Sequence, residues 1–94
     1  MTRKISILGS TGSIGCNTVD LIQRLPEGAV GVEALTGSAN VTLLAKQAKA
    51  LRAKVAVTAN PDFYEPLKQA LAGSGIEAAA GVHALIEAAA RPVD

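Results

Sequence analysis

Apolar and polar side chains alternate along this chain with two different spacings. Short runs of small or β-branched apolar residues, which favour strands, cover residues 5–8, 30–36, 55–57 and 76–80. Between and after these runs, apolar residues recur three or four positions apart, as they do on one face of a helix. The pattern therefore predicts four strands that alternate with four helices.

The first predicted helix follows a glycine-rich stretch, residues 9–15, and ends before Pro26 and Gly28. Its apolar residues fall at positions that share one face of a helix. We expect this helix to bury a stripe that consists of Ile14, Thr18, Leu21, Ile22 and Leu25.

The later helices carry recognisable start and stop signals. Asn40 precedes the second helix as an N-cap residue, and Asn60 with Pro61 marks the start of the third. Glycines in residues 73–75 end the third helix, and Pro92 follows the fourth. The stripes expected to be buried are Val41, Leu44, Ala45, Ala48 and Leu51 in the second helix, Phe63, Leu67, Ala70 and Leu71 in the third, and Val82, Leu85, Ile86 and Ala89 in the fourth.

Strands that alternate with helices predict right-handed βαβ units, with a parallel sheet covered by helices on both faces. The expected fold class is α/β, a Rossmann-like doubly wound parallel sheet. A chain of 94 residues supports a single hydrophobic core and buries a modest share of its surface. We therefore expect residues 1–94 to form part of one domain, with an incomplete sheet that would gain stability by docking against more chain.

Composition and charge exclude several classes of function. The nine basic and eight acidic residues are scattered and give a net charge of +1, which offers no surface for nucleic acid or an anionic membrane. No apolar stretch reaches the length of a membrane helix, and the amino-terminal apolar run is too short for a signal peptide. The single cysteine, Cys16, allows no intrachain disulfide. We therefore expect a cytoplasmic protein with no nucleic-acid or membrane partner.

Residues 9–15, Gly-Ser-Thr-Gly-Ser-Ile-Gly, join the first strand to the first helix and are the main candidate for a binding site. In such a turn Gly9 lets the chain leave the strand sharply, Gly12 lets the backbone approach a pyrophosphate, and Gly15 lets the helix pack closely. The first N–H groups of the helix would face the phosphates with the positive end of the helix dipole. The glycine-rich turn therefore favours a dinucleotide as the ligand of this site.

The hydroxyl groups of Ser10, Thr11 and Ser13 add possible hydrogen-bond donors to the same turn. The glycines could instead serve only to shape the turn, but their position between a strand and a helix favours phosphate binding. A P-loop is excluded because no Gly-Lys-Ser/Thr follows at the required spacing.

The end of the second strand indicates which dinucleotide is bound. NAD enzymes place an acidic residue there to hold the ribose 2′-hydroxyl, whereas residues 35–40, Leu-Thr-Gly-Ser-Ala-Asn, contain none. Ser38, Asn40 and the start of the second helix offer donors to a 2′-phosphate, so the sequence favours NADP over NAD. The other interpretation of Asn40 is that it only caps its helix.

The sequence of residues 7–15, followed by Thr18 and Asp20, resembles the opening of the 1-deoxy-D-xylulose 5-phosphate reductoisomerase family. The resemblance covers essentially the whole chain and is also carried by residues 34–35, 40–42 and 55–57. Family members often have a basic residue where this chain has Ala39, so a 2′-phosphate here would lack a direct cation. The implied NADPH-binding residues are Thr11, Gly12, Ser13 and Ile14 at the phosphates and Ser38 and Asn40 at the adenosine 2′-phosphate.

For the whole protein, the resemblance implies NADPH-dependent conversion of 1-deoxy-D-xylulose 5-phosphate to 2-C-methyl-D-erythritol 4-phosphate in isoprenoid precursor biosynthesis. It further implies a phosphosugar substrate, a homodimer, and a divalent metal, Mg²⁺ or Mn²⁺, held by an Asp and two Glu. In the family these ligands lie beyond residue 94, so we assign no catalytic or metal residue. We expect residues 1–94 alone to be inactive.

Two other functions stay open at this point. The chain could belong to another NADP-dependent oxidoreductase, such as a semialdehyde or homoserine dehydrogenase, although the sequence of residues 10–15 argues against this. It could also be a module that senses NAD(P) without catalysis, because one fold hosts many functions. The lone His83 and Cys16 are interpreted as structural, and the acidic residues show no metal-ligand spacing.

Overall fold

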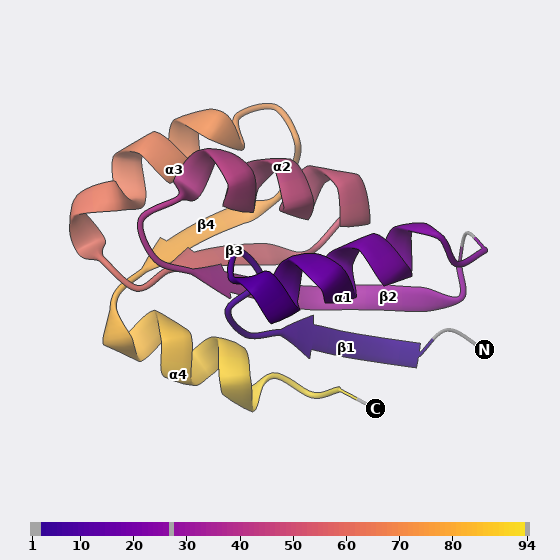
Figure 1. The fold of residues 1–94 in the computed structure, drawn as a ribbon. Helices are drawn as coiled ribbons and strands as arrows, with labels where there is room; N and C mark the ends of the chain where they lie inside the picture. Colours follow the sequence, from indigo (N-terminus) through magenta and orange to yellow (C-terminus); the bar gives the residue numbers. More distant parts are fainter. Residues whose placement is uncertain (1–2, 27, 94) are drawn as a thin grey trace.

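A computed structural model of the protein describes residues 3–26 and 28–93. Within these residues the strands form one parallel sheet in the order β1-β2-β3-β4, flanked by helices (Figure 1). The strands are β1 (Arg3–Ile7), β2 (Val30–Gly37), β3 (Val55–Thr58) and β4 (Glu77–Ala80). The helices are α1 (Ser13–Gln23), α2 (Val41–Leu51), α3 (Tyr64–Ala70) and α4 (Val82–Ala90), with a 3-10 turn, η1 (Pro61–Phe63), before α3.

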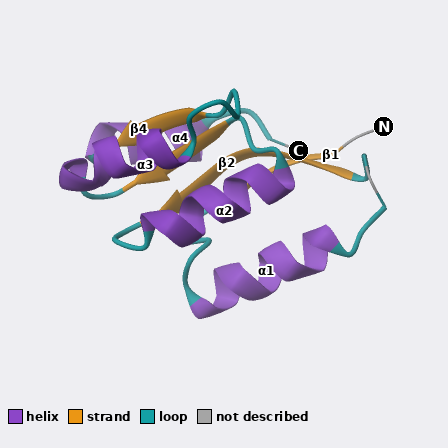
Figure 2. Cartoon of the chain, turned by 90° about the horizontal axis from the view of Figure 1, so that it is seen from above, coloured by secondary structure: helices purple, strands orange, loops and turns teal. Residues whose placement is uncertain are grey.

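Helices cover both faces of the sheet. α1, α2 and α3 lie side by side over one face, and α4 lies against the opposite face (Figures 1 and 2). Each strand pairs in parallel with the next one along the chain, so that Leu35 of β2 lies between Ile7 of β1 and Ala56 of β3. The predicted Rossmann-like α/β class is confirmed.

The main core lies between the sheet and the helices α2 and α3. Leu35 of β2, Leu44 of α2 and Leu67 of α3 are fully buried there. A smaller cluster on the other face packs Val57 of β3 against Ala88 of α4. The apolar stripe predicted for α2 is confirmed, since its members are either buried or packed against the main core.

The buried face of α1 differs from the predicted one. Gly15 and Val19 are buried, and Ile22 packs against the core. The prediction is confirmed at Ile22. It is wrong at the largest apolar residues of the stripe, because the helix turns its smallest residue inward to approach the preceding turn. Three residues of the predicted stripe are exposed instead: Ile14 at 84%, Leu21 at 65% and Leu25 at 46%.

Smaller corrections concern β1 and α4. Leu8 was expected in the first strand but lies in the turn after it, with 59% of its surface exposed. In α4 the predicted residues Val82, Ile86 and Ala89 are exposed, because a different face of the helix, which includes Ala88, packs on the sheet. The residues of α4 that pack on the sheet are Ala84, Leu85 and Ala88.

Glu33, a buried residue, links α4 to the sheet through a network of ion pairs. Its carboxylate extends from β2 and contacts Lys54 Nζ at 3.2 Å and Arg91 Nε at 3.1 Å. Burial raises the pKa of this carboxyl, but the hydrogen bonds and positive charges of Lys54 and Arg91 outweigh burial and hold the pKa below its ordinary value. Arg91 directly follows α4, so the network fastens the end of that helix to β2.

We expect Glu33→Gln to lower the free energy of unfolding by about 1 to 2 kcal/mol at pH 7, because charge-assisted hydrogen bonds lose their charge. The folded pKa of Glu33 lies below that of the unfolded chain, so the carboxylate contributes stability above the unfolded pKa. This contribution disappears as the pH falls through the folded pKa. Thermal unfolding of parent and variant should therefore differ at pH 7 and converge as the pH falls below the folded pKa of Glu33.

Glu87→Gln is the matched control for this prediction. Glu87 also contacts Arg91, at 3.5 Å, but its side chain is 72% exposed. Exposed ion pairs contribute little, so the control should change stability by less than about 0.5 kcal/mol. A difference at Glu33 that does not depend on pH, or equal effects of the two variants, would contradict the assigned role.

Candidate functional site

The loops that follow β1 and β2 meet at the carboxyl edge of the sheet (Figure 1). In open α/β sheets, ligands bind outside this edge. The glycine-rich turn leads from β1 into α1, and residues 38–40 lead from β2 into α2. These loops and the first turn of α1 contain all the residues predicted to bind the cofactor, namely Thr11, Gly12, Ser13, Ile14, Ser38 and Asn40.

The glycine-rich turn leaves the amino end of α1 exposed to solvent. Gly9 has a φ of +72°, in the left-handed region that favours glycine, and its carbonyl oxygen accepts a 3.1 Å hydrogen bond from Gly12 N–H. Gly12 is the N-cap of α1, and no side chain caps the helix. The first N–H groups of a helix have no intrahelical acceptor. Ser13 and Ile14 are exposed, so their N–H groups are available to an anion.

Gly15 allows α1 to pack directly on the turn. A Cβ atom at this position would lie 2.1 Å from the Gly9 carbonyl oxygen and 2.5 Å from Ser10 Cα. Both contacts are with backbone atoms, which cannot rotate away as a side chain can. Gly15 therefore permits the close packing that its position in the sequence predicts, and this prediction is confirmed.

Thr36, near the end of β2, anchors the other side of the turn. Its Oγ1 accepts a 2.9 Å hydrogen bond from Gly9 N–H, and its carbonyl oxygen accepts one of 2.8 Å from Ser10 N–H. The Ser10 hydroxyl is buried and donates to the same carbonyl oxygen at 3.4 Å. Ser10 was expected to offer its hydroxyl to a ligand, and this expectation is wrong.

Residues 38–40 form a short exposed loop after β2. The Ser38 carbonyl oxygen accepts a 2.6 Å hydrogen bond from Thr58 Oγ1, which fixes the loop to the end of β3. Asn40 Oδ1 accepts a 3.2 Å hydrogen bond from Leu43 N–H, so Asn40 caps α2 as expected. The cap uses the amide oxygen of Asn40, and the group that could donate to an anion is the amide nitrogen.

The two loops adjoin at Thr11 and Gly37. A Cβ atom at residue 37 would lie 3.1 Å from Thr11 Oγ1, so the Thr11 side chain rests against Gly37, directly before Ser38. The glycine-rich turn and the loop after β2 therefore form one continuous edge. A single ligand of dinucleotide size can contact both.

Gln47 of α2 is a functional candidate that sequence reasoning missed. Its side chain is buried, and Nε2 donates a 2.9 Å hydrogen bond to the Ser10 carbonyl oxygen in the turn. The available signal was its position three residues after Leu44, on the face of α2 predicted to be buried. A polar residue at such a position requires a buried partner.

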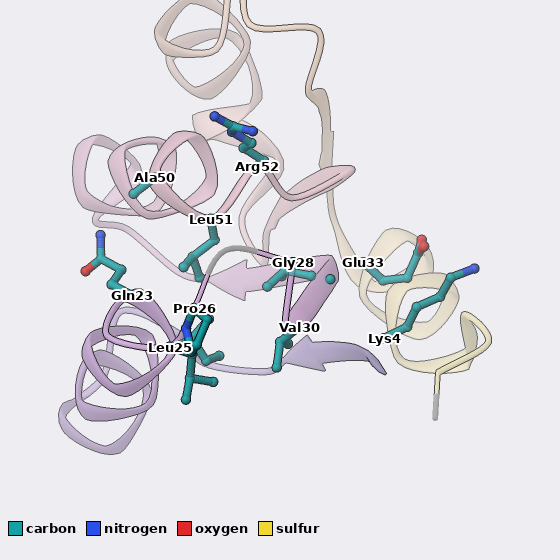
Figure 3. Close-up of a pocket in the computed structure, with 13 residues that line it drawn as sticks. Lys4, Gln23, Leu25, Pro26, Gly28, Val30, Glu33, Ala50, Leu51 and Arg52 are labelled. Carbon is teal, nitrogen blue, oxygen red and sulfur yellow. The ribbon is translucent and has the colours of Figure 1, made fainter. Parts of the chain in front are cut away.

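Two cavities lie at opposite edges of the sheet. One of about 480 Å³ adjoins the glycine-rich turn and is lined by Gly12, Ser13 and Ile14, among others. The other, of about 610 Å³, opens at the amino ends of β1 and β2 between the carboxyl ends of α1 and α2 (Figure 3). Leu25, Leu51 and other apolar residues contribute to its lining. Lys4, Glu33 and Arg52 bring charges of both signs to its lining. The cavity beside the glycine-rich turn instead adjoins the amino end of α1, which favours anions.

Residues 3–26 and 28–93 lack the features of two other classes of site. No helix in this part of the chain is long and apolar enough to cross a membrane. No group of three or more His, Cys, Asp or Glu side chains in the same residues could hold a metal ion. His83 is exposed in the first turn of α4.

The family model that matches this chain and the related sequences carry the same family name. Residues 5–94 match the family model of 1-deoxy-D-xylulose 5-phosphate reductoisomerase. The chain is 61% identical over 92 residues to the enzyme of that name from Ruegeria pomeroyi, and 59% identical over 93 residues to the one from Rhizobium rhizogenes. Each alignment covers 98% of this chain and 23% of the relative, so the chain spans about a quarter of the relatives' length.

Solved structures show the same similarity. The reductoisomerase from Zymomonas mobilis in complex with NADPH matches 99% of this chain and 24% of that chain, with 50% identity and a TM-score of 0.95. A DOX-P reductoisomerase in complex with NADPH, fosmidomycin and magnesium matches 98% of this chain and 23% of that chain, with 35% identity and a TM-score of 0.87.

The packing around Gly15 generates a stability prediction. Gly→Ala inside a helix normally stabilises by roughly 0.5 to 1 kcal/mol, but Gly15→Ala should destabilise by about 1 to 3 kcal/mol because the methyl group meets backbone. The control is Gly12→Ala, whose Cβ would meet only the Gly9 carbonyl oxygen, at 3.5 Å. Loss of the glycine N-cap should cost less than about 1 kcal/mol. Urea unfolding measures both changes, and a Gly15→Ala variant as stable as the parent would refute this packing.

Proposed function

Because this chain belongs to the 1-deoxy-D-xylulose 5-phosphate reductoisomerase family, we propose that residues 1–94 form the amino-terminal part of an NADPH-binding domain. The observation that carries the proposal is the glycine-rich turn, which presents the uncapped start of α1 at the carboxyl edge of the sheet. The family match also separates the chain from the semialdehyde and homoserine dehydrogenases.

The phosphates of NADPH are assigned to Thr11, Gly12, Ser13 and Ile14. Backbone N–H groups at the start of α1 supply donors, and the positive end of the helix dipole adds a favourable field. The exposed hydroxyl of Ser13 can add a further donor. Gly12 has no side chain to occupy the adjoining cavity, so phosphates can approach the backbone closely.

The adenosine 2′-phosphate is assigned to Ser38 and Asn40. Residues 37–42 contain neither an acid that would repel a phosphate nor a base that would attract it. The donors in reach are the Ser38 hydroxyl, the Asn40 amide nitrogen and the start of α2. These uncharged donors favour NADPH, which carries the 2′-phosphate, over NADH, which lacks it. They do so without a lysine or arginine side chain at the phosphate.

The whole protein, on this proposal, converts 1-deoxy-D-xylulose 5-phosphate to 2-C-methyl-D-erythritol 4-phosphate with NADPH in isoprenoid precursor biosynthesis. The names of the relatives and the ligands of the similar structures, NADPH, fosmidomycin and magnesium, support it. Residues 1–94 contribute to the NADPH site. The phosphosugar and a divalent metal, Mg²⁺ or Mn²⁺, bind to residues of the whole protein that lie outside residues 1–94. We further propose a cytoplasmic homodimer in which residues 1–94 alone are inactive.

Gly12→Val tests the assignment of the phosphates. The branched side chain would fill the space next to the helix start, so NADPH affinity should fall about 100-fold or more. The backbone at Gly12 is extended, with φ −78° and ψ 174°, so valine fits the fold. Ala50→Val, an exposed position in α2 that lines the opposite cavity, is the matched control and should leave affinity unchanged. A folded Gly12→Val protein that binds NADPH within a fewfold of the parent would defeat the assignment.

A second pair of variants tests the 2′-phosphate loop through the ratio of the NADH and NADPH dissociation constants. Ser38→Glu should lower this ratio by about tenfold or more, since a carboxylate repels the 2′-phosphate and accepts from a ribose hydroxyl. Ala39→Arg should raise the ratio by supplying a cation. Ala72→Glu adds the same charge beyond α3, away from the loop, and should change nothing. All proteins are measured at one ionic strength, and an unchanged ratio for Ser38→Glu would mean that this loop is not the 2′-phosphate site.

A further inference from the structure

We propose that Gln47 is a positioning residue that orients the phosphate-binding turn, an inference that rests on the proposed NADPH function. Gln47 lies on the inner face of α2 beside Leu44 and Ala48, and only 6% of its surface is exposed. Its amide reaches across to the turn that follows β1, 37 positions earlier in the chain. In the proposed role Gln47 acts through the turn and not by contact with the ligand.

The amide of Gln47 holds two consecutive carbonyl groups of the turn. Nε2 donates to the Ser10 carbonyl oxygen at 2.9 Å and to Cys16 Sγ at 3.6 Å. The Cys16 thiol in turn donates to the Thr11 carbonyl oxygen at 3.6 Å. Gln47 therefore fixes one peptide group directly and the next one through Cys16.

Fixing the Ser10 carbonyl also fixes the N–H group of Thr11. The two groups belong to one peptide bond, which is trans, so they point in opposite directions. With the carbonyl drawn toward α2, the Thr11 N–H points away from α2. Gln47 thus sets the orientation of a donor in the segment assigned to the phosphates.

The burial of Gln47 is costly for the fold, which favours a role beyond packing. Its Oε1 atom is buried and has no hydrogen-bond partner within residues 3–26 and 28–93. An unsatisfied buried polar group destabilises a protein, and an apolar side chain of equal size would avoid this penalty. The one geometric result of keeping the amide is the fixed orientation of the turn.

Gln47 also connects the two halves of the assigned site. Its helix, α2, is capped by Asn40, which is assigned with Ser38 to the 2′-phosphate. The same rigid helix therefore carries the loop for one end of the cofactor and the side chain that orients the turn for the other. A displaced turn would weaken binding of the phosphates that bridge the dinucleotide while leaving the 2′-phosphate loop in place.

Gln47→Met is the test, because methionine has a similar length and no hydrogen-bond donor. We expect the NADPH dissociation constant to rise about tenfold, as for the loss of one buried hydrogen bond, with the thermal midpoint unchanged or higher. Adenosine 2′-monophosphate, which lacks the pyrophosphate, should bind within about twofold of its affinity for the parent. Gln69→Met, the same change at an exposed position of α3, is the matched control and should alter neither affinity.

The outcomes separate this inference from the proposed function. A parent protein that fails to bind NADPH would refute the proposed function itself. A parent that binds NADPH, with a folded Gln47→Met variant that loses affinity for both ligands equally or for neither, would refute the role of Gln47 alone. Gln47→Asn, whose amide is one methylene too short to reach Ser10, should reproduce the selective loss. Failure of both variants to fold would show that Gln47 serves the fold alone and would overturn the inference.

Discussion

The close contact between α1 and the backbone of the glycine-rich turn is the constraint on which the rest of the site depends. At residue 15 the helix approaches Gly9 and Ser10 so closely that only a hydrogen atom fits in place of a side chain. This contact sets the rotation of α1, which buries Val19 and leaves Ile14 in solvent. It also aims the first N–H groups of the helix outward from the edge of the sheet, where an anion can reach them.

Neighbouring βαβ units secure the turn from its other sides. Thr36 of β2 binds the backbone of Gly9 and Ser10, and Gln47 of α2 binds the Ser10 carbonyl. The turn is therefore held by the same strand and helix that flank the loop of residues 38–40. This arrangement explains how two loops distant in sequence form one continuous edge.

The proposed phosphate site contains no cationic side chains. Residues 8–18 and 37–42 contain no lysine or arginine, so phosphates would be bound by N–H groups, hydroxyls and two helix termini. Such short-range, directional interactions are screened by salt less than those of exposed charged side chains. Recognition then depends on the orientation of the backbone, which gives the buried anchors Thr36 and Gln47 their importance.

Local sequence patterns predicted the helices and strands, the parallel sheet, and the loops that contain the six residues assigned to NADPH. These features were predictable because the spacing of apolar residues, the N-caps and the glycines act over only a few residues. They did not predict the inward face of α1, since that face follows from contact with the turn rather than from the size of its side chains. Thr36, Gln47 and Glu33 were missed for a related reason. Each is a polar residue whose role depends on partners far away in the sequence, and no local pattern identifies those partners.

Backbone amide chemical shifts recorded during an NADPH titration show which residues the cofactor contacts. We expect the largest changes at the amides of residues 11–15 and 38–40. Residues that line the cavity at the opposite edge, such as Gly31 and Ala50, should change little (Figure 3). Largest changes at that opposite cavity, with residues 11–15 unaffected, would contradict the account.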